Sequence, residues 1–225
     1  MSNETLLLLS VFGNLAVVLG CYKGGRRWLE AYIIVATVTI YCIAGKVFDF
    51  HGFTVNPSAG TYAGIFLATD MLTERYGKKV GYNMIRLGFF SAILFVCITQ
   101  FSLFLTPLSA VEPLAGAMDT VFGTSLRIFI GSVLAYLVAQ HFDVWFYHFV
   151  HGKTGGKFLW LRNNLSTGVS QFIDSVIFFT IAFYGVVPNL VEMILVGYVI
   201  KLGIAAIDTP FMYLSKRITP MDAVS

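Results

Sequence analysis

The sequence predicts an all-α membrane protein, a polytopic helix bundle forming a single transmembrane domain over residues 1–225. Of its 225 residues, 57% are hydrophobic and only 12% are charged, whereas about a quarter of the residues in soluble domains are charged. Long apolar runs recur along the whole chain and leave no stretch as long as an ordinary soluble domain. Both observations argue against a soluble globular protein and place the chain in the lipid bilayer.

The length of the apolar runs sets the number of helices. A helix needs about 20 residues to cross about 30 Å of hydrocarbon, which predicts seven transmembrane helices here, with six as the alternative. The predicted spans lie near residues 5–22, 29–48, 58–74, 82–105, 125–150, 163–185 and 190–214. The segment 106–124 contains two prolines and two acidic residues, which favours an outer loop with a short interfacial or re-entrant piece.

Basic residues mark every second boundary between the predicted spans. They follow the first, third, fifth and seventh spans, at Lys23, Arg26, Arg27, Arg75, Lys78, Lys79, Lys153, Lys157, Arg162, Lys216 and Arg217. The intervening loops, 49–57, 106–124 and 185–189, contain no lysine or arginine. Because Lys and Arg concentrate in cytoplasmic loops, we expect the N-terminus outside and the C-terminus in the cytoplasm. The net charge of +3 is spread over these loops, so we expect anionic lipid and no nucleic acid as its partner.

The sixth predicted span carries a polar stripe. At about 100° per residue, one face of this helix collects Asn164, Thr167, Gln171 and Asp174. Asp174 lies roughly 15 Å from the basic end, near the middle of the membrane, where transporters commonly bind their substrates. A carboxylate at that depth costs roughly 2.5 to 3.5 kcal/mol to insert, so Asp174 is expected to serve a binding site. Ser166 and Ser170 fit a binding role and interhelical hydrogen bonding equally well.

Two carboxylates lie near the cytoplasmic end of the third predicted span. Asp70 and Glu74 are four residues apart and therefore project to one face of the helix. Like charges at this spacing repel, and a helix C-terminus disfavours anions, so the pair needs compensation. Either Arg75, Lys78 or Arg86 provides an ion pair, or one carboxylate stays protonated.

The fifth and seventh predicted spans add further polar groups. Gln140 and Asp143 are three residues apart on the fifth span and share a face, so they are candidates to complete a polar cavity. Lys201 is deep in the seventh span, where its ammonium group needs an acidic partner, either Asp174 or Asp208.

Several motifs for catalysis or cofactor binding are incomplete. Gly152-Lys153-Thr154 resembles the end of a phosphate-binding loop, but Tyr147 stands where its first glycine is needed, so the chain has no ATPase of its own. His148 and His151 are not accompanied by a carboxylate or cysteine at a metal-binding spacing. We therefore expect no cofactor, no metal ion and no enzymatic activity.

Two segments resemble the signatures of a known family. Residues 70–77, DMLTERYG, resemble the D-x-L-T-E-x-Y-G signature of the queuosine precursor transporter family, also called the vitamin uptake transporter family. Residues 166–175, STGVSQFIDS, resemble the second signature of that family, S-T-x-x-S-Q-x-x-D-[ST]. The resemblance covers nearly the whole chain and implies import of 7-deazaguanine bases, such as preQ0, preQ1 or queuine, across a bacterial or archaeal cytoplasmic membrane.

This implied substrate agrees with the chemistry of the candidate residues. A guanine-like edge presents a ring N–H beside an exocyclic amine, and the carboxylate of Asp174, Glu74 or Asp70 can accept from both. Gln171 or Asn164 can donate to the 6-oxo group. The ring face is expected to stack on Phe172, Tyr76 or Trp145. The substrate-binding candidates are thus Asp174, Gln171, Ser170, Thr167, Asn164, Asp70, Glu74, Asp143 and Gln140.

Three functions compete for these residues. The first is a secondary transporter for deazapurine bases, in which one of the carboxylates can instead carry a coupling proton. The second is a substrate-binding subunit that uses an external ATPase module. The third is an intramembrane enzyme acting through the carboxylates or histidines. The sequence favours the first, and it is compatible with a homodimer.

Overall fold

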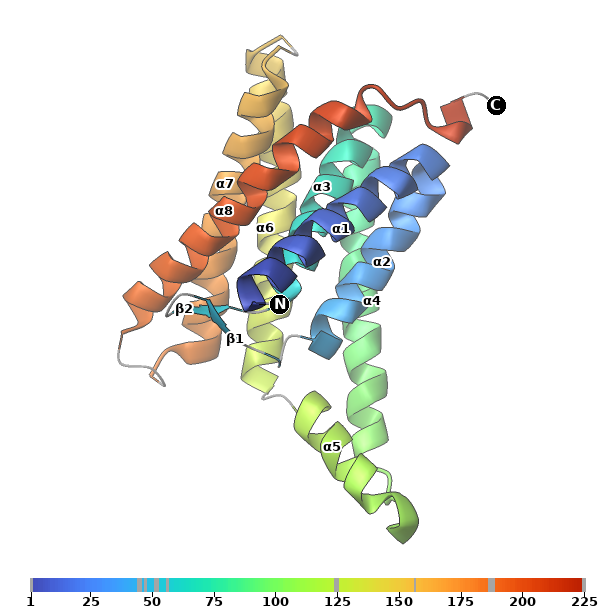
Figure 1. Cartoon of the computed structure of the whole chain (residues 1–225), viewed down its shortest axis with the longest axis vertical. Helices are drawn as coiled ribbons and strands as arrows, with labels where there is room; N and C mark the ends of the chain where they lie inside the picture. The colour runs from blue at the N-terminus through green and yellow to red at the C-terminus, as the bar shows by residue number, and fades with distance from the viewer. Residues whose placement is uncertain are drawn as a thin grey trace.

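The computed structural model describes residues 2–43, 46, 48–50, 53–55, 57–123, 126–155, 157–185 and 189–223. The described residues form a bundle of α-helices, in which α3 lies behind α1, between a side made of α2 and α4 and a side made of α6, α7 and α8 (Figure 1). The helices are α1 (Asn3–Gly24), α2 (Arg26–Ile43), α3 (Ser58–Tyr76), α4 (Lys78–Leu103), α5 (Glu112–Phe122), α6 (Leu126–Lys153), α7 (Leu159–Phe183) and α8 (Leu190–Ser215). Two 3-10 turns, η1 (Ser109–Val111) and η2 (Met221–Ala223), precede α5 and follow α8.

Glycines set two of the tight turns between helices. α1 ends and α2 begins at Gly25, which has φ 98°, and α3 ends and α4 begins at Gly77, which has φ 90°. L-amino acids with a side chain rarely adopt such values, whereas glycine does so without a steric penalty. These turns make α1 and α2, and likewise α3 and α4, antiparallel neighbours.

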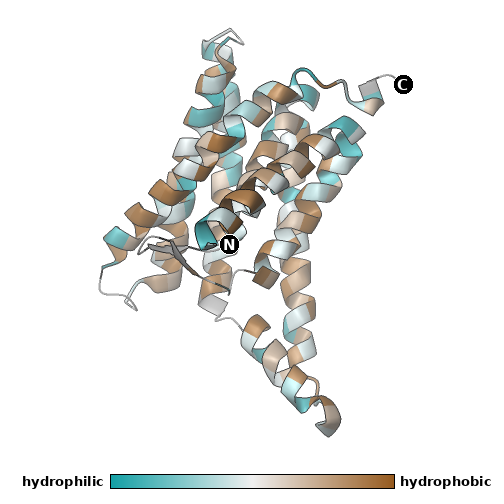
Figure 2. Cartoon of the chain, in the orientation of Figure 1, coloured by the Kyte–Doolittle hydropathy of each residue, from teal (hydrophilic) through white to brown (hydrophobic). Residues whose placement is uncertain are grey.

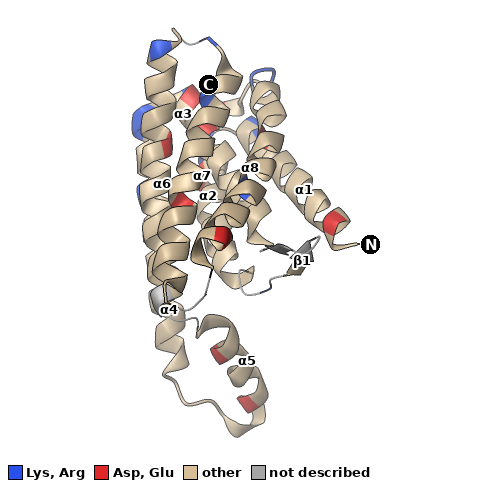
Figure 3. Cartoon of the chain, turned by 90° about the vertical axis from the view of Figure 1, so that its left-hand side faces the viewer, with Lys and Arg blue, Asp and Glu red and all other residues tan. Residues whose placement is uncertain are grey.

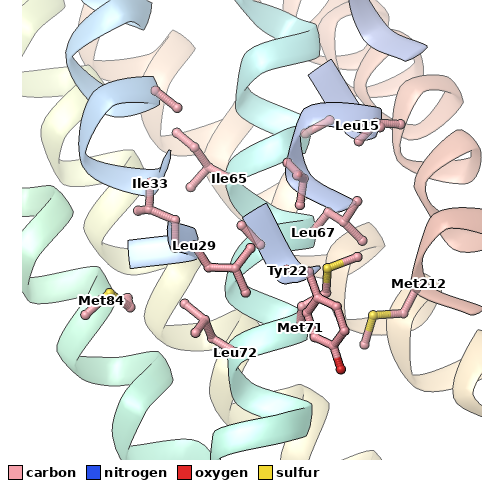
Figure 4. Close-up of a cluster of buried hydrophobic side chains, with 14 of the residues drawn as sticks. Leu15, Tyr22, Leu29, Ile33, Ile65, Leu67, Met71, Leu72, Met84 and Met212 are labelled. Carbon is pink, nitrogen blue, oxygen red and sulfur yellow. The ribbon is translucent and has the colours of Figure 1, made fainter. Parts of the chain in front are cut away.

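α3 is the central helix of the bundle. Every residue from Ala63 to Thr73 is buried, and α3 packs against α1, α2, α4 and α8. Figure 4 shows Leu67, Met71 and Leu72 of α3 surrounded by apolar side chains of the neighbouring helices. These neighbours include Leu15 and Tyr22 of α1, Leu29 and Ile33 of α2, Met84 of α4 and Met212 of α8. A helix enclosed in this way can carry charged residues without exposing them to lipid.

Large hydrophobic side chains such as Phe12, Ile98 and Leu195 are exposed on the outer helices, as a bilayer requires, and hydrophobic residues are frequent along these helices in Figure 2. Within the described residues, five helices are long and apolar enough to cross a membrane: α1, α4, α6, α7 and α8. α2 carries three charged residues among 18 and α3 carries three among 19, so charged residues are more frequent in these two helices than in the five longer ones. The predicted helical, multi-pass membrane protein is therefore confirmed, whereas the count of seven spans stays a prediction.

Three predicted boundaries differ from the structure by four residues or more, and one of them is the start of the fourth span, expected at residue 82 but found at Lys78 in α4. The second span was expected to reach residue 48, but α2 ends at Ile43, and β1 (Phe48–Phe50) pairs antiparallel with β2 (Phe53–Val55). Phe, Thr and Val favour strands, so this loop forms a small hairpin that the all-α prediction omitted. The sixth span was expected to start at residue 163, but α7 starts at Leu159 because the backbone turns at Phe158, whose φ is 55°. Arg162 consequently lies inside α7.

The segment between α4 and α6, predicted as an outer loop with a short interfacial or re-entrant piece, contains the short helix α5. α5 is about 16 Å long at about 1.5 Å per residue, too short to cross the bilayer. Among its described residues none is buried, and it extends beyond the rest of the bundle next to the end of α4 (Figure 1). Lys and Arg gather at the opposite end of the bundle, which also carries the C-terminus (Figure 3). Some residues of the predicted spans (44, 45, 47 and 125) and of the predicted loops (51, 52, 56, 124 and 186–188) lie outside the described residues.

Candidate functional site

The helices that carry the two signature segments face each other through long side chains. Tyr62 of α3 meets Asp174 of α7, and Glu74 of α3 meets Arg162 of α7. Both contacts are consistent with one antiparallel alignment, because Tyr62 and Glu74 have the same separation in sequence as Arg162 and Asp174. The two contacts are about 18 Å apart along the helices at about 1.5 Å per residue. A polar column thus runs through an otherwise apolar bundle.

The first end of the column is the Asp174 cluster, formed by Asp174, Tyr62 and Lys201. The Tyr62 hydroxyl donates to Asp174 Oδ1 over 2.6 Å, and Lys201 Nζ of α8 forms an ion pair with Asp174 Oδ2. The Lys201 ammonium group also lies 5.6 Å from the centre of the Tyr62 ring, a cation–π distance. Asp174 is 5% exposed, so its charge depends on these two partners rather than on solvent. Of the two acids predicted to pair with Lys201, the structure selects Asp174.

The second end is the Glu74 cluster, formed by Glu74, Arg162, Tyr147 and Lys216. Arg162, which is 1% exposed, forms an ion pair with Glu74 Oε1, and the Tyr147 hydroxyl donates to Glu74 Oε2 over 3.0 Å. Lys216 Nζ lies 3.4 Å from Glu74 Oε1. The guanidinium group of Arg162 also lies 5.3 Å from the centre of the Tyr147 ring. The predicted need for a cation beside Glu74 is therefore met by Arg162 and Lys216, and the three candidates named from the sequence were wrong.

A cavity of about 350 Å³ adjoins the Glu74 cluster. It is lined by Tyr22, Met71, Glu74, Arg75, Ser215, Lys216, Ile218, Thr219 and Pro220. Small-molecule sites have volumes of roughly 300 to 1,000 Å³, so this cavity has the size of a site for one small ring system. It lies at the end of the bundle that is rich in Lys and Arg (Figure 3).

The chain segment after α8 borders this cavity and is held by Asp222 of η2. The backbone N–H of Arg26 donates to Asp222 Oδ2 over 2.8 Å, and the Tyr76 hydroxyl donates to Asp222 Oδ1 over 2.8 Å. The Arg26 hydrogen bond is the main reason that the pKa of Asp222 lies below its usual value. The C-terminal segment is thereby fixed to the turn between α1 and α2.

Between the two ends lies the carboxyl cluster, formed by Asp70 of α3, Asp143 of α6 and Asp208 of α8. All three side chains are fully buried. The Ser170 hydroxyl of α7 donates to Asp143 Oδ1 over 2.9 Å, and Asn163 Nδ2 donates to Asp208 Oδ1 over 2.9 Å. The structure thus brings Asp70, Asp143 and Ser170, predicted from three separate spans, into one place.

Several buried amide and hydroxyl groups of the column have polar atoms that form no hydrogen bond among the described residues. Gln140, Thr167 and Gln171 are at most 3% exposed. Both amide atoms of Gln140, the Gln171 carbonyl and the Thr167 hydroxyl have no hydrogen-bond partner among the described residues. Buried polar atoms without partners are rare in proteins, which makes these groups candidates to bind a ligand.

Other predicted residues lie outside the column. Asn164 donates to the Trp160 carbonyl and to Thr209 of α8, so it joins two helices. Its neighbour Asn163 faces the column instead. The three rings expected to stack on a base also lie elsewhere: Phe172 and Trp145 are 42% and 46% exposed, and Tyr76 binds Asp222.

The residues that the sequence analysis did not place in the site are Tyr62, Tyr147, Arg162 and Asn163. Tyr62, Tyr147 and Asn163 were given no role in the site, and Arg162 was placed among the basic residues of a cytoplasmic loop. One signal was available in the sequence: the equal spacing of Tyr62 to Glu74 and of Arg162 to Asp174. It becomes meaningful only once α3 and α7 are known to be antiparallel neighbours.

Among the described residues, no three His, Cys, Asp or Glu side chains gather closely enough to hold a metal ion. The column offers carboxylates, amides, hydroxyls, the buried guanidinium group of Arg162 and the partly buried ammonium group of Lys201, which suits recognition of a polar solute.

Comparison with known proteins shows the family of the chain. A family model described as "Putative vitamin uptake transporter" matches residues 58–215, from the first residue of α3 to the last residue of α8. A protein of Bacillus subtilis (strain 168) named "Probable queuosine precursor transporter" is 32% identical over 226 aligned residues, which cover 99% of this chain and 98% of that protein. No solved structure matches the chain. The chain therefore belongs to the vitamin uptake transporter family, and it is a multi-pass membrane transporter rather than an enzyme.

Proposed function

We propose that the chain imports queuosine precursors, 7-deazaguanine bases such as preQ0, preQ1 or queuine, across the cytoplasmic (inner) membrane as a secondary transporter. The relative named as a queuosine precursor transporter supports the substrate class. The observation that carries the proposal is the polar column between α3 and α7, with the buried carboxylate of Asp174 at one end and a cavity at the other.

The proposed topology has seven spans, with the N-terminus outside and the C-terminus in the cytoplasm. Charged residues are more frequent in α2 and α3 than in the five most apolar helices, but α3 is enclosed by its neighbours and needs no apolar surface toward lipid. Arg26 and Arg27 lie at the end of α2 that is rich in Lys and Arg, where they meet lipid headgroups (Figure 3). The gathering of Lys and Arg at this end supports a cytoplasmic assignment for it.

Asp174 is the proposed anchor for the base. Its carboxylate can accept two parallel hydrogen bonds from a guanine edge, one from the ring N–H and one from the exocyclic amine. Gln171, three residues earlier on α7, can donate its amide N–H to the 6-oxo group while its carbonyl accepts from another ring N–H. The Tyr62 ring stands in the Asp174 cluster and replaces the exposed Phe172 as the proposed stacking partner.

Lys201 is bound to the Asp174 carboxylate, which is the group proposed to bind the base. Binding of a base edge at Asp174 exchanges the Lys201 ion pair for two N–H donors, so α8 or the Lys201 side chain must move when substrate binds. This exchange provides a way for substrate to change the packing of α8 against α7, which alternating access requires. The cavity beside Glu74 is the proposed exit, where the carboxylate meets the cationic aminomethyl group that some of these bases carry.

Uptake by proteoliposomes that contain this chain alone tests the proposal. We expect accumulation of radiolabelled preQ1, inhibited by unlabelled preQ0 and queuine and not by unrelated vitamins. Asp174→Asn should abolish this uptake, whereas Asp119→Asn on the exposed helix α5 should not change it.

Strict dependence on an added ATPase module would contradict a secondary transporter and identify a substrate-binding subunit instead. Lack of uptake and of binding for every deazaguanine would contradict the substrate class. A homodimer stays a prediction that mass measurement in detergent can test.

A further inference from the structure

The carboxyl cluster contains two buried acids that lie beside each other. The Tyr147 hydroxyl of α6 donates to Glu74 of α3, and Asp143 and Asp70 lie one helical turn before these two residues on the same two helices. Because α3 and α6 are each antiparallel to α7, they run in the same direction, so Asp70 and Asp143 face each other, and both are fully buried. Two carboxyl groups placed in this way can form a hydrogen bond only if one of them carries a proton, because two carboxylates only accept.

The surroundings of the pair supply hydrogen bonds but no opposite charge. The Ser170 hydroxyl donates to Asp143 Oδ1. Among the described residues, no lysine, arginine or histidine forms an ion pair with Asp70 or Asp143, whereas both Asp174 and Glu74 have cations. Separate buried charges without partners are far too costly, so a proton is what stabilises this pair.

A second observation points to the same place. Gln140 lies three residues before Asp143 on α6 and therefore shares its face. It is fully buried, and both its amide atoms have no partner among the described residues, as is true of both Asp70 oxygens and of Asp143 Oδ2. An amide that can donate to a carboxylate or accept from a carboxylic acid suits a site whose protonation changes.

The other groups that face the pair come from several helices. They are Glu74 of α3, Tyr147 of α6 and Asp208 of α8, while Arg162 of α7 acts on Tyr147 and Glu74. On α1, Tyr22 interacts with Glu74, and α4 presents the uncharged Gly81 beside Thr73. The side chains closest to the pair are therefore mostly acidic, and this environment favours the binding of a proton.

The pair is also linked to the proposed substrate anchor. Ser170, which donates to Asp143, and Asp174 are four residues apart on α7, so their Cβ atoms are about 5 to 6 Å apart on one face of the helix. A shift of α7 or α8 when a base replaces Lys201 at Asp174 would change the hydrogen bond from Ser170 to Asp143.

We propose that Asp70 and Asp143 form a proton-binding site through which the import of a base is coupled to the entry of one proton. The proposal rests on the transport function proposed above and names the proton gradient as the energy source of that transport. The proton enters the pair from the outer side, is held while Asp174 carries the base, and leaves toward the cytoplasm when the contact between Asp70 and Asp143 opens.

Proton entry can be measured directly. Proteoliposomes containing a pH-sensitive dye and the wild-type chain should acidify inside when preQ1 is added outside, and an inward proton gradient should raise preQ1 accumulation. Asp70→Asn and Asp143→Asn should each reduce the protons carried per base at least tenfold, whatever base flux remains. Asp119→Asn on α5 serves as the matched control, because it removes an exposed carboxylate far from the pair.

The outcomes separate the two proposals. If the wild-type chain moves no deazaguanine, the transport function is wrong. If it moves the base without acidification, or requires a sodium gradient instead, the transport function stands and the proton site is wrong. Equal proton-to-base ratios in Asp70→Asn and the wild type would also overturn it.

A spectroscopic measurement on purified protein applies even if the variants fold poorly. Infrared difference spectra of the wild type with and without preQ1 should show a protonated carboxylic acid whose carbonyl band changes on binding and shifts in heavy water. If no such band responds to preQ1, the pair does not exchange a proton and the proposal is wrong.

Discussion

The ion pair between Glu74 and Arg162 gives a prediction whose size follows from burial. Glu74→Gln keeps the shape of the side chain but removes the negative charge that faces Arg162, a guanidinium group that is 1% exposed. Removing one partner of a buried pair costs about 3 to 5 kcal/mol because the other charge stays buried. Glu74 itself is 23% exposed, and Gln retains one acceptor, so we reduce this to about 2 to 3 kcal/mol.

Thermal unfolding in detergent measures this loss. For a chain of this size, about 2 to 4 °C of Tm correspond to 1 kcal/mol, so Glu74→Gln should lower Tm by about 4 to 12 °C. Arg75→Gln is the matched control, since Arg75 is exposed and adjacent in sequence, and it should change Tm by less than about 2 °C. The double variant Glu74→Gln/Arg162→Gln should be more stable than the sum of the single effects predicts.

Equal Tm values for Glu74→Gln and the Arg75→Gln control would refute this reasoning. So would strict additivity in the double variant, because it would show that Arg162 does not depend on Glu74.

Three further predictions concern other parts of the chain. Lys201→Met should lower Tm, because it leaves Asp174 in the bundle without its cation, and adding Asp174→Asn should restore most of the loss; no rescue would contradict the ion pair. Gly64→Ala should cost about 1 to 3 kcal/mol, because the added Cβ would lie 2.6 Å from the Asn14 amide nitrogen; a neutral effect on Tm would contradict the close packing of α1 and α3. The pKa of Asp222 is lowered by folding, so its stabilising contribution is present above about pH 4 and is lost as the pH falls below that value. Hydrogen exchange should show the amide bound by Asp222 less protected at about pH 3 than at about pH 6, and Asp222→Asn should remove the difference.

The parts of the fold that could be predicted from sequence are those set by local composition. Apolar length placed each predicted span on one of the long helices, and the prolines of the segment 106–124 indicated that it does not cross the membrane. The start of α7 was missed by four residues because it depends on the left-handed backbone of Phe158, which a residue of that type rarely adopts. That error put Arg162 in a loop and removed it from consideration as an intramembrane cation.

In the candidate site, too, features set within one helix could be predicted from the sequence, whereas contacts between helices could not. Helical periodicity correctly grouped Thr167, Gln171 and Asp174 on a buried face of α7, because spacing within one helix fixes direction. The asparagine that faces the column is Asn163, which donates to Asp208, and not the predicted Asn164. The two are adjacent in sequence at the edge of the polar face of α7, and periodicity does not decide which of them faces inward. Partners from different helices depend on which helices are neighbours, so the contacts of Tyr62 and Arg162 with α7 and α3 could not be derived from periodicity.

Equilibrium binding of preQ1 to the purified chain tests the central claim most directly. The account predicts binding by the wild type, at least tenfold weaker binding by Asp174→Asn, and unchanged binding by Phe172→Ala, which alters an exposed ring two residues away. Equal affinity in the wild type and Asp174→Asn would contradict the claim that the polar column between α3 and α7 recognises the base.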